Sequence, residues 1–295
     1  MSLDDTPLAR AAEAAVQIKQ RRVGSLPAPA STRIMTMANQ KGGVGKTSLV
    51  SNMALGLSKQ GKKVLIFDGD LGMANVDIFF GVHPQKNLQD VISGTPLKEC
   101  LTPVAQNIDL LAGGSGLYNL CHLNAFQRRE VLAHIDEMNF MYDYLIIDTS
   151  PGLHDHVLHL NSIADECLVV ITPDPSSFTD AYALIKVLHQ KYKTQKFSII
   201  CNQVSDEKAG AQLYLRFADV AQQFLPIRLN YKKTIPFDPQ LKLSNQLQRL
   251  VLRQDAKSVS SQAITALCGE IVSQNQMVSS PYENVKSIDI LFRPA

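Results

Sequence analysis

Apolar and polar residues alternate along the chain in blocks rather than singly. From Arg33 onward, short runs rich in Val, Ile and Leu are separated by longer segments with helical spacing, such as residues 124–138 and 178–190. Nearly continuous apolar runs are typical of strands buried on both faces, hence of a parallel sheet with helices on each side. The predicted strands are RIMTMA (33–38), KVLIFD (63–68), IDLLAG (108–113), YLIID (144–148), ECLVVIT (166–172) and FSIICN (197–202).

The two ends of the chain depart from this pattern. An Ala-rich, basic stretch over 8–22 precedes GSLPAPAST (24–32), whose Gly, Pro and Ser indicate a linker. The N-terminal stretch is either a disordered tail or a detachable helix that recruits a partner. We therefore expect an extension and linker over 1–32, one α/β domain over 33–275 with a helical end from about 240, and a C-terminal tail over 276–295.

Composition narrows the function classes. The 295 residues carry a formal net charge of +2, so the charge as a whole gives no reason to expect nucleic acid or a membrane surface as partner. The five cysteines are widely spaced without a CxxC pair, which is typical of reduced thiols and not of a zinc site or disulfide framework. With no apolar signal-peptide core and no apolar run long enough to span a bilayer, the expected location is the cytoplasm.

A glycine-rich loop follows the first predicted strand and opens the next helix. The stretch NQKGGVGKT (39–47) fits a phosphate-binding P-loop, in which glycines let successive backbone N–H groups face phosphate oxygens. Lys46 is expected to neutralise the β- and γ-phosphates, and the Thr47 hydroxyl to bind Mg²⁺. The predicted nucleotide-binding residues of this loop are Gly42, Gly43, Val44, Gly45, Lys46, Thr47 and Ser48.

A second lysine, Lys41, precedes the loop glycines. The form KGGxGK[ST] resembles the deviant Walker A motif of the MinD/ParA class of ATPases (also called SIMIBI). The resemblance implies that ATP closes two subunits into a sandwich dimer and that Lys41 reaches the phosphates in the partner's site, much as an arginine finger does. The alternative is a surface lysine on a loop.

Acidic and amide residues follow other predicted strands, at the edge where open α/β sheets bind ligands. In DGDLGMANVD (68–77), the resemblance implies that Asp70 orients the attacking water, that Asp68 supports the Mg²⁺ shell, and that Asn75 senses the γ-phosphate. Helix capping is the alternative for these side chains. Asp148, after an apolar strand and before a Gly-containing turn, fits a Walker B aspartate that holds Mg²⁺ through water.

Three further features concern the base and the switch segments. By resemblance, Asn202 reads the adenine edge and IPFD, with Pro236, Phe237 and Asp238, closes the base pocket; a plain Pro turn is the alternative for the latter. Gly152 is the expected hinge of a second switch. The histidines of HDHVLH (154–159) lack metal-ligand spacing and are assigned to a dimer-facing switch helix.

Within the class, the segments DLGMANVDIFFGV (70–82), NLQDVISG (87–94) and SSFTDAYALIKVL (176–188) resemble the FleN/FlhG family of flagellar-number regulators over about residues 33–270. The resemblance implies a slow Mg²⁺-dependent ATPase that is monomeric with ADP and dimeric with ATP. It also implies a flagellar GTPase of the FlhF type and a flagellar transcriptional regulator as partners, and attachment to the inner face of the cell membrane. The start, DDTPLARAAEAA, lacks the family's usual activator motif, and SIDILFRPA offers only a short amphipathic turn. MinD-type division control, ParA-type DNA partition and a non-catalytic nucleotide sensor are the alternatives, with DNA binding the least expected.

Overall fold

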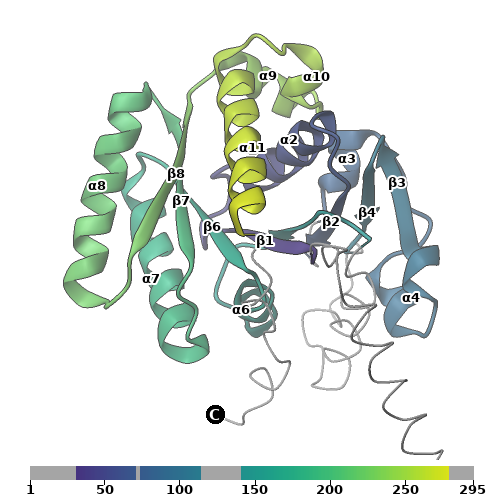
Figure 1. Cartoon of the computed structure of the whole chain (residues 1–295), viewed down its shortest axis with the longest axis horizontal. Helices are drawn as coiled ribbons and strands as arrows, with labels where there is room; N and C mark the ends of the chain where they lie inside the picture. The colour runs from purple at the N-terminus through teal and green to yellow at the C-terminus, as the bar shows by residue number, and fades with distance from the viewer. Residues whose placement is uncertain (1–30, 71–73, 114–140, 279–295) are drawn as a thin grey trace, which may run out of the picture. The chain divides into compact units, whose positions relative to one another are not determined.

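The computed structural model describes residues 31–70, 74–113 and 141–278, which contain one eight-stranded sheet of order β3-β4-β2-β5-β1-β6-β7-β8 (Figure 1). All neighbouring strands are parallel except β3 and β4. The predicted doubly wound α/β class is confirmed. The strand bounds are β1 Arg33–Ala38, β2 Val64–Gly69, β3 Leu101–Ala105, β4 Ile108–Leu111, β5 Tyr144–Thr149, β6 Glu166–Ile171, β7 Phe197–Val204 and β8 Leu229–Pro236.

Two strands of this sheet are absent from the predicted set. The edge strand β3 contains Pro103 and is only partly buried, so it carries no continuous apolar run. The strand β8 at the other edge reads LNYKKTIP, with two lysines in its middle. Lys232 is nevertheless buried, because it forms an ion pair with Glu166 at 2.9 Å. Both strands are hidden from pattern analysis by polar or cyclic residues that the edges of a sheet tolerate.

Helices cover both faces of the sheet, as alternate side chains of each strand point to opposite sides. One core cluster joins α2, α10 and α11 to residues such as Met37, Ile66 and Ile146; another joins α7 and α8 to residues such as Val169 and Ile199. The helix bounds are α2 Lys46–Lys59, α3 Val76–Phe80, α4 Leu88–Ile92, η1 Leu97–Cys100, α6 Asp155–Ser162, α7 Pro175–Tyr192, α8 Glu207–Phe224, α9 Pro239–Gln246, α10 Val251–Gln254 and α11 Val259–Val278.

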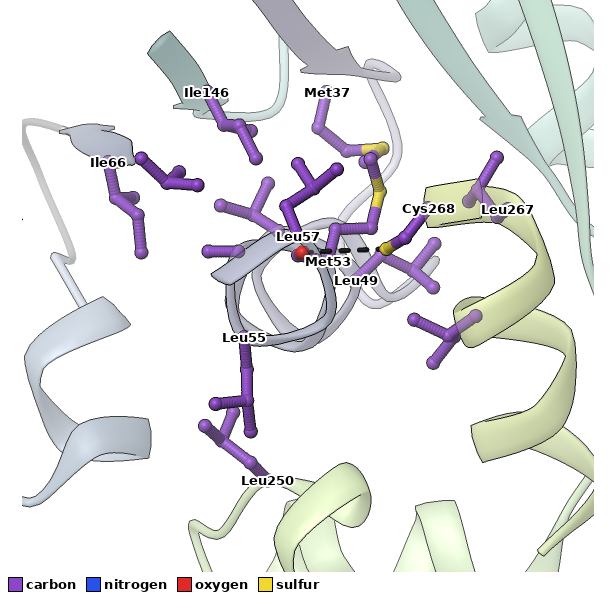
Figure 2. Close-up of a cluster of buried hydrophobic side chains, with 14 of the residues drawn as sticks. Met37, Leu49, Met53, Leu55, Leu57, Ile66, Ile146, Leu250, Leu267 and Cys268 are labelled. Carbon is purple, nitrogen blue, oxygen red and sulfur yellow. Dashed lines mark hydrogen bonds between the residues drawn. The ribbon is translucent and has the colours of Figure 1, made fainter. Parts of the chain in front are cut away.

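The helix that follows the P-loop, α2, is enclosed by the sheet and by α11. Figure 2 shows Leu49, Met53 and Leu57 of α2 between strand side chains and Leu267 and Cys268 of α11. The Cys268 Sγ lies 3.5 Å from the Met53 carbonyl oxygen. A Cβ atom placed on Gly56 would lie 2.7 Å from this sulfur, so only glycine allows the two helices to approach this closely.

Several expected features lie outside the described residues. These are the N-terminal extension up to residue 30, the helix expected over 124–138, Cys121, and the tail from residue 279. Residues Ser31–Val278 form one compact unit. No helix in the described ranges is both long and apolar enough to cross a bilayer.

Candidate functional site

The P-loop connects the end of β1 to the start of α2. Gly43 and Gly45 have φ angles of 76° and 99°, values that side chains other than glycine rarely adopt. Gly45 is the N-cap of α2 and supplies no side-chain acceptor for the first helical N–H groups. A Cβ placed on Gly42 or Gly43 would meet nothing within 4 Å, so the loop backbone faces open space. The first N–H groups of a helix have no intrahelical partner, and together with the positive end of the 14-residue α2 they favour an anion there.

Lys46, the first residue of α2, is almost fully buried beside this loop. Its Nζ donates a hydrogen bond to the Lys41 carbonyl oxygen at 3.1 Å. Burial lowers the pKa of Lys46, an effect that the nearby carboxylates of Asp148 and Asp70 oppose. Burial and the acidic neighbours therefore act on the Lys46 ammonium group in opposite directions, with burial the larger effect. Ser48, two residues further on, donates from Oγ to Asn245 Oδ1 at 2.7 Å, so its hydroxyl is bound to α9.

Two carboxylates lie side by side at the ends of β2 and β5, where Asp68 pairs in register with Asp148. Each is about 1% exposed. Burial, with the neighbouring Asp68 charge, raises the pKa of Asp148 to about 8, while the Thr47 hydroxyl opposes the shift. Burial raises the pKa of Asp68 to about 7. Two adjacent buried carboxylates are costly unless a cation compensates them.

A divalent cation fits this pair. Asp148 Oδ1 is buried without a hydrogen-bond partner among the described residues, and the Thr47 hydroxyl bonds to the same carboxylate. Hard oxygen ligands of this kind are those that Mg²⁺ prefers. Asp148 and Thr47, with Asp68 behind them, are the residues that would hold Mg²⁺, which would supply charge neutralisation at the phosphates.

Asp68 also organises the loop that leads to Asp70. Its carboxylate accepts backbone N–H groups from Asp70, Asn75 and Val76 at 3.2, 3.0 and 3.1 Å. Asn75 is the N-cap of α3, so Asp68 satisfies donors at the start of this helix, which is the capping role weighed as the alternative. Asp70 is close enough to Lys46 to influence its pKa. Residues 71–73 lie outside the described residues.

Lys41 does not point into its own phosphate loop. Its Nζ forms an ion pair with Asp174 Oδ2 at 2.7 Å and donates to Ser176 Oγ at 2.6 Å. Asp174 is the N-cap of α7 and also accepts from Ser176 N at 2.8 Å. Lys41 and Ser176 hold the pKa of Asp174 well below its usual range.

The start of α7 holds the entrance of the P-loop as well. The buried Asn39 donates from Nδ2 to the Val170 and Ser177 carbonyl oxygens at 2.6 and 3.3 Å, and its Oδ1 accepts Lys41 N at 2.8 Å. Gln40 donates to the Asp180 carbonyl oxygen at 2.9 Å. Sequence reasoning missed these roles because the partners lie more than 130 residues apart. The only signal was the resemblance of the segment 176–188 to a known family.

The chain is similar to known proteins in sequence and in fold. The AAA_31 family, described as an AAA domain, matches residues 32–200. The antiactivator FleN of Pseudomonas aeruginosa is 32% identical to this chain, over 82% of this chain and 86% of FleN. The flagellum site-determining protein YlxH of Helicobacter pylori is 31% identical, over 87% of this chain and 88% of YlxH. This chain belongs to the FleN family of MinD/ParA-class ATPases. In fold it is similar to septum site-determining protein MinD of Pyrococcus horikoshii, solved with Mg-ADP, at a TM-score of 0.68 and 24% identity over 83% of this chain and 98% of that one.

On the base side of this FleN-family site, the expected residues are held by protein contacts. The amide of the buried Asn202 donates from Nδ2 to the Val44 carbonyl oxygen at 2.8 Å. Asp238 is the N-cap of α9 and accepts Ser260 N and Oγ of α11 at 3.0 and 2.6 Å. Pro236 ends β8, and the Phe237 ring next to it is 54% exposed. Contact of these residues with adenine stays a prediction.

The histidine-rich segment of this FleN-family member lies at the start of α6, shortly after β5. The buried His156 ring lies 3.3 Å from Ser150 Oγ through Nε2, and it stacks on the exposed His154 ring at 5.8 Å between centroids. Gly152, the expected hinge, has a φ angle of 107°. Among the described residues, no group of three or more His, Cys, Asp or Glu side chains is arranged to hold a metal ion.

Proposed function

We propose that this protein is an ATP-dependent switch that dimerises with ATP, hydrolyses it slowly and returns to a monomer with ADP. The observation that carries the proposal is the separation of the two lysines. Lys46 is buried in its own loop, whereas Lys41 is held at the surface by an ion pair with a half-exposed Asp174. Because surface ion pairs contribute little free energy, a partly exposed lysine in such a pair can be released to a second subunit, and its charge would favour the dimer only when a nucleotide's phosphates are present.

The chemistry proposed is the attack of water on the γ-phosphorus, with ADP as the leaving group and inorganic phosphate as the second product. Asp70 orients the water and accepts its proton, and Lys46 with the loop N–H groups stabilises the charge on the transferred phosphoryl oxygens. Lys41 of the partner adds positive charge at the bridging oxygen. Asp148 and Thr47 would hold Mg²⁺, which would neutralise charge on the phosphates. The proximity of Asp70 to the buried Lys46 supports this assignment.

The biological output proposed is control of the number or placement of flagella from the cytoplasm. The support is the likeness to an antiactivator, FleN, and to a flagellum site-determining protein. The partners proposed on this basis are a GTPase of the FlhF type and a flagellar transcriptional regulator, with the inner face of the cell membrane as a docking surface. Each of these partners would bind the dimer and the monomer with different affinities.

Light scattering coupled to gel filtration tests the switch. The protein should elute as a monomer with Mg-ADP and as a dimer with a non-hydrolysable ATP analogue. Asp70→Ala should retain ATP binding, lose phosphate release and accumulate as the dimer in ATP. Protein that stays monomeric in every nucleotide contradicts the switch.

A mixed dimer tests whether Lys41 acts across the interface. Wild-type protein is paired with a Lys41→Ala, Asp70→Ala double variant, and heterodimers are isolated with two affinity tags. If Lys41 acts in the partner's site, one composite site lacks Asp70 and the other lacks the lysine, so the heterodimer is inactive. If Lys41 acts in its own site, the wild-type site remains active, and this result would rule out the cross-subunit role.

A further inference from the structure

Asn202 is held in place by an unusual piece of backbone at the end of β7. The next residue, Gln203, has a φ angle of 59°, in the left-handed region that residues other than glycine seldom adopt. The β7–β8 register shifts between Asn202 and Val204, so Gln203 is the extra residue of a bulge. Gln203 N donates to Asn202 Oδ1 at 3.0 Å. Strain of this kind persists only where the surroundings over-determine it, and it clusters at functional positions.

The bulge fixes the Asn202 amide against the P-loop. Asn202 is 2% exposed, and its Nδ2 lies 2.8 Å from the Val44 carbonyl oxygen, 158 residues away in the sequence. The approach is close enough that a Cβ on Gly45 would lie 2.6 Å from this nitrogen. The absence of a side chain at Gly45 therefore serves the contact with Asn202 as well as the loop's own geometry.

The contact sets the orientation of one peptide of the loop. In a planar trans peptide, the C=O and the N–H point in opposite directions. Holding the Val44 carbonyl oxygen toward Asn202 therefore points the Gly45 N–H the other way, where it is available to an anion. Because Gly45 has almost no steric preference between positive and negative φ, this peptide is the one most able to flip and present a carbonyl oxygen to a phosphate.

We propose that Asn202 is a positioning residue for phosphate binding: its amide locks the Val44–Gly45 peptide of the P-loop in the anion-binding orientation. The inference rests on the proposed function in so far as the loop binds a nucleotide's phosphates. Among the described residues, one N–H and one carbonyl lone pair of the amide have partners, and the other N–H and lone pair are left for a base. Base binding and phosphate binding then share a single side chain.

Inorganic tripolyphosphate, which has no base, separates this role from base reading. The Mg²⁺ complexes of tripolyphosphate and of a non-hydrolysable ATP analogue are titrated into wild-type protein and Asn202→Ala, with calorimetry as the readout. Loss of the hydrogen bond from Asn202 to the Val44 carbonyl oxygen should weaken tripolyphosphate binding about ten-fold, as expected for a lost buried hydrogen bond. Unchanged tripolyphosphate affinity with weakened ATP-analogue binding would show that Asn202 only reads the base, and a wild-type protein with no tripolyphosphate affinity would equally overturn the inference.

A buried asparagine elsewhere is the matched control. Asn161 in α6 is fully buried and donates from Nδ2 to the Val157 carbonyl oxygen, also at 2.8 Å. Asn161→Ala should lower the melting temperature without changing the affinity for tripolyphosphate. An equal loss of tripolyphosphate affinity in both variants would mean that general destabilisation is responsible, and not the loss of the Asn202–Val44 hydrogen bond.

A second pair of variants tests the bulge without removing the amide. The Gln203 side chain is exposed, and glycine at this position keeps the left-handed backbone whereas a β-branched valine opposes it. Gln203→Gly should retain tripolyphosphate affinity, and Gln203→Val should weaken it several-fold. Equal affinities in these two variants contradict the proposal even if Asn202→Ala does not fold. Failure of the proposed switch is a separate result, since it appears as an unchanged oligomeric state in ATP and leaves these affinities standing.

Discussion

Replacing Asp148 by asparagine should stabilise the protein when no divalent cation is present. The pKa of Asp148 is raised from 3.8 to about 8 by burial and by the neighbouring Asp68 charge. Because this pKa lies about four units above the ordinary value, ionisation of the side chain at pH 8 destabilises the folded protein by at most about 6 kcal/mol. Water penetration and relaxation reduce such penalties, and asparagine also loses the attraction to Lys46, so we expect a net gain of about 2 kcal/mol. For a domain of this size, that is a rise in melting temperature of about 4–8 °C.

The sign of the pH dependence follows from the direction of the shift. Because the folded-state pKa of Asp148 lies above the unfolded value, its protonated form stabilises the fold below about pH 4, and this contribution is lost as the pH rises toward 8. Wild-type protein in EDTA should therefore melt at progressively lower temperature across this window. Asp148→Asn should show a smaller slope, with the remainder due to Asp68, whose pKa is raised to about 7.

Thermal unfolding followed by circular dichroism from pH 5 to pH 8.5, in EDTA and then in Mg-ATP, measures both effects. Mg-ATP should raise the melting temperature of the wild type much more than that of Asp148→Asn, because only the wild type offers the Asp148 carboxylate to the cation. Asp219→Asn, which removes an exposed carboxylate from α8, is the control for net charge. An Asp148→Asn protein that melts below the wild type at pH 8 in EDTA would refute the reasoning, since it would show that the ionised carboxylate is compensated within the protein.

Three further changes have defined outcomes. Burial opposes the ionisation of Glu166, but its ion-pair partners outweigh burial and lower its pKa, so the stabilisation from this carboxylate is present above about pH 4.5 and lost in acid. Glu166→Gln should therefore cost about 3–5 kcal/mol of unfolding free energy at pH 7, measured in urea, and should reduce the loss of stability below pH 4.5. An unchanged loss of stability in acid contradicts this. Gly56→Ala should cost about 1–3 kcal/mol of unfolding free energy, because the added methyl group would overlap the Cys268 sulfur. The Gly56→Ala, Cys268→Ala double variant should recover part of this stability, and additive losses of the two single variants in a double-mutant cycle would exclude the steric cause. Asp174→Ala should free Lys41 and lower the dissociation constant of the ATP-analogue dimer in analytical ultracentrifugation, while Asp174→Glu should not.

The parts of the molecule that could be predicted from sequence are those in which neighbouring residues share one environment. The six predicted strands are buried along most of their length, so their apolar runs are visible without knowledge of the partners. The P-loop was likewise predictable, because strand, glycines and helix are consecutive. The strand β8 was not, because the burial of Lys232 depends on Glu166, 66 residues away.

The missing parts of the site have the same physical cause. Nothing in the spacing of KGGVGKT indicates that Lys41 meets Asp174 and Ser176, because that contact exists only when β6 lies beside β1. The hydrogen bond from Asn202 to the P-loop depends in the same way on a bulge that the residue types of β7 do not predict. Resemblance predicted Asn202 as a binding residue, but its contact with the Val44 carbonyl oxygen depends on the folded arrangement of β7 and the P-loop.

The enclosure of α2 by α11 has a consequence for synthesis of the protein. The helix that begins the nucleotide site ends at Lys59, and the helix that covers it begins at Val259. At typical translation rates, roughly 200 intervening residues take about 10–40 s to be added. During that time Leu49, Met53 and Leu57 lack their apolar cover, so a growing chain carries a complete P-loop sequence on an incomplete core. Chaperones that shield apolar helices would have their longest opportunity here, and the proposed switch would become available only once α11 has left the ribosome.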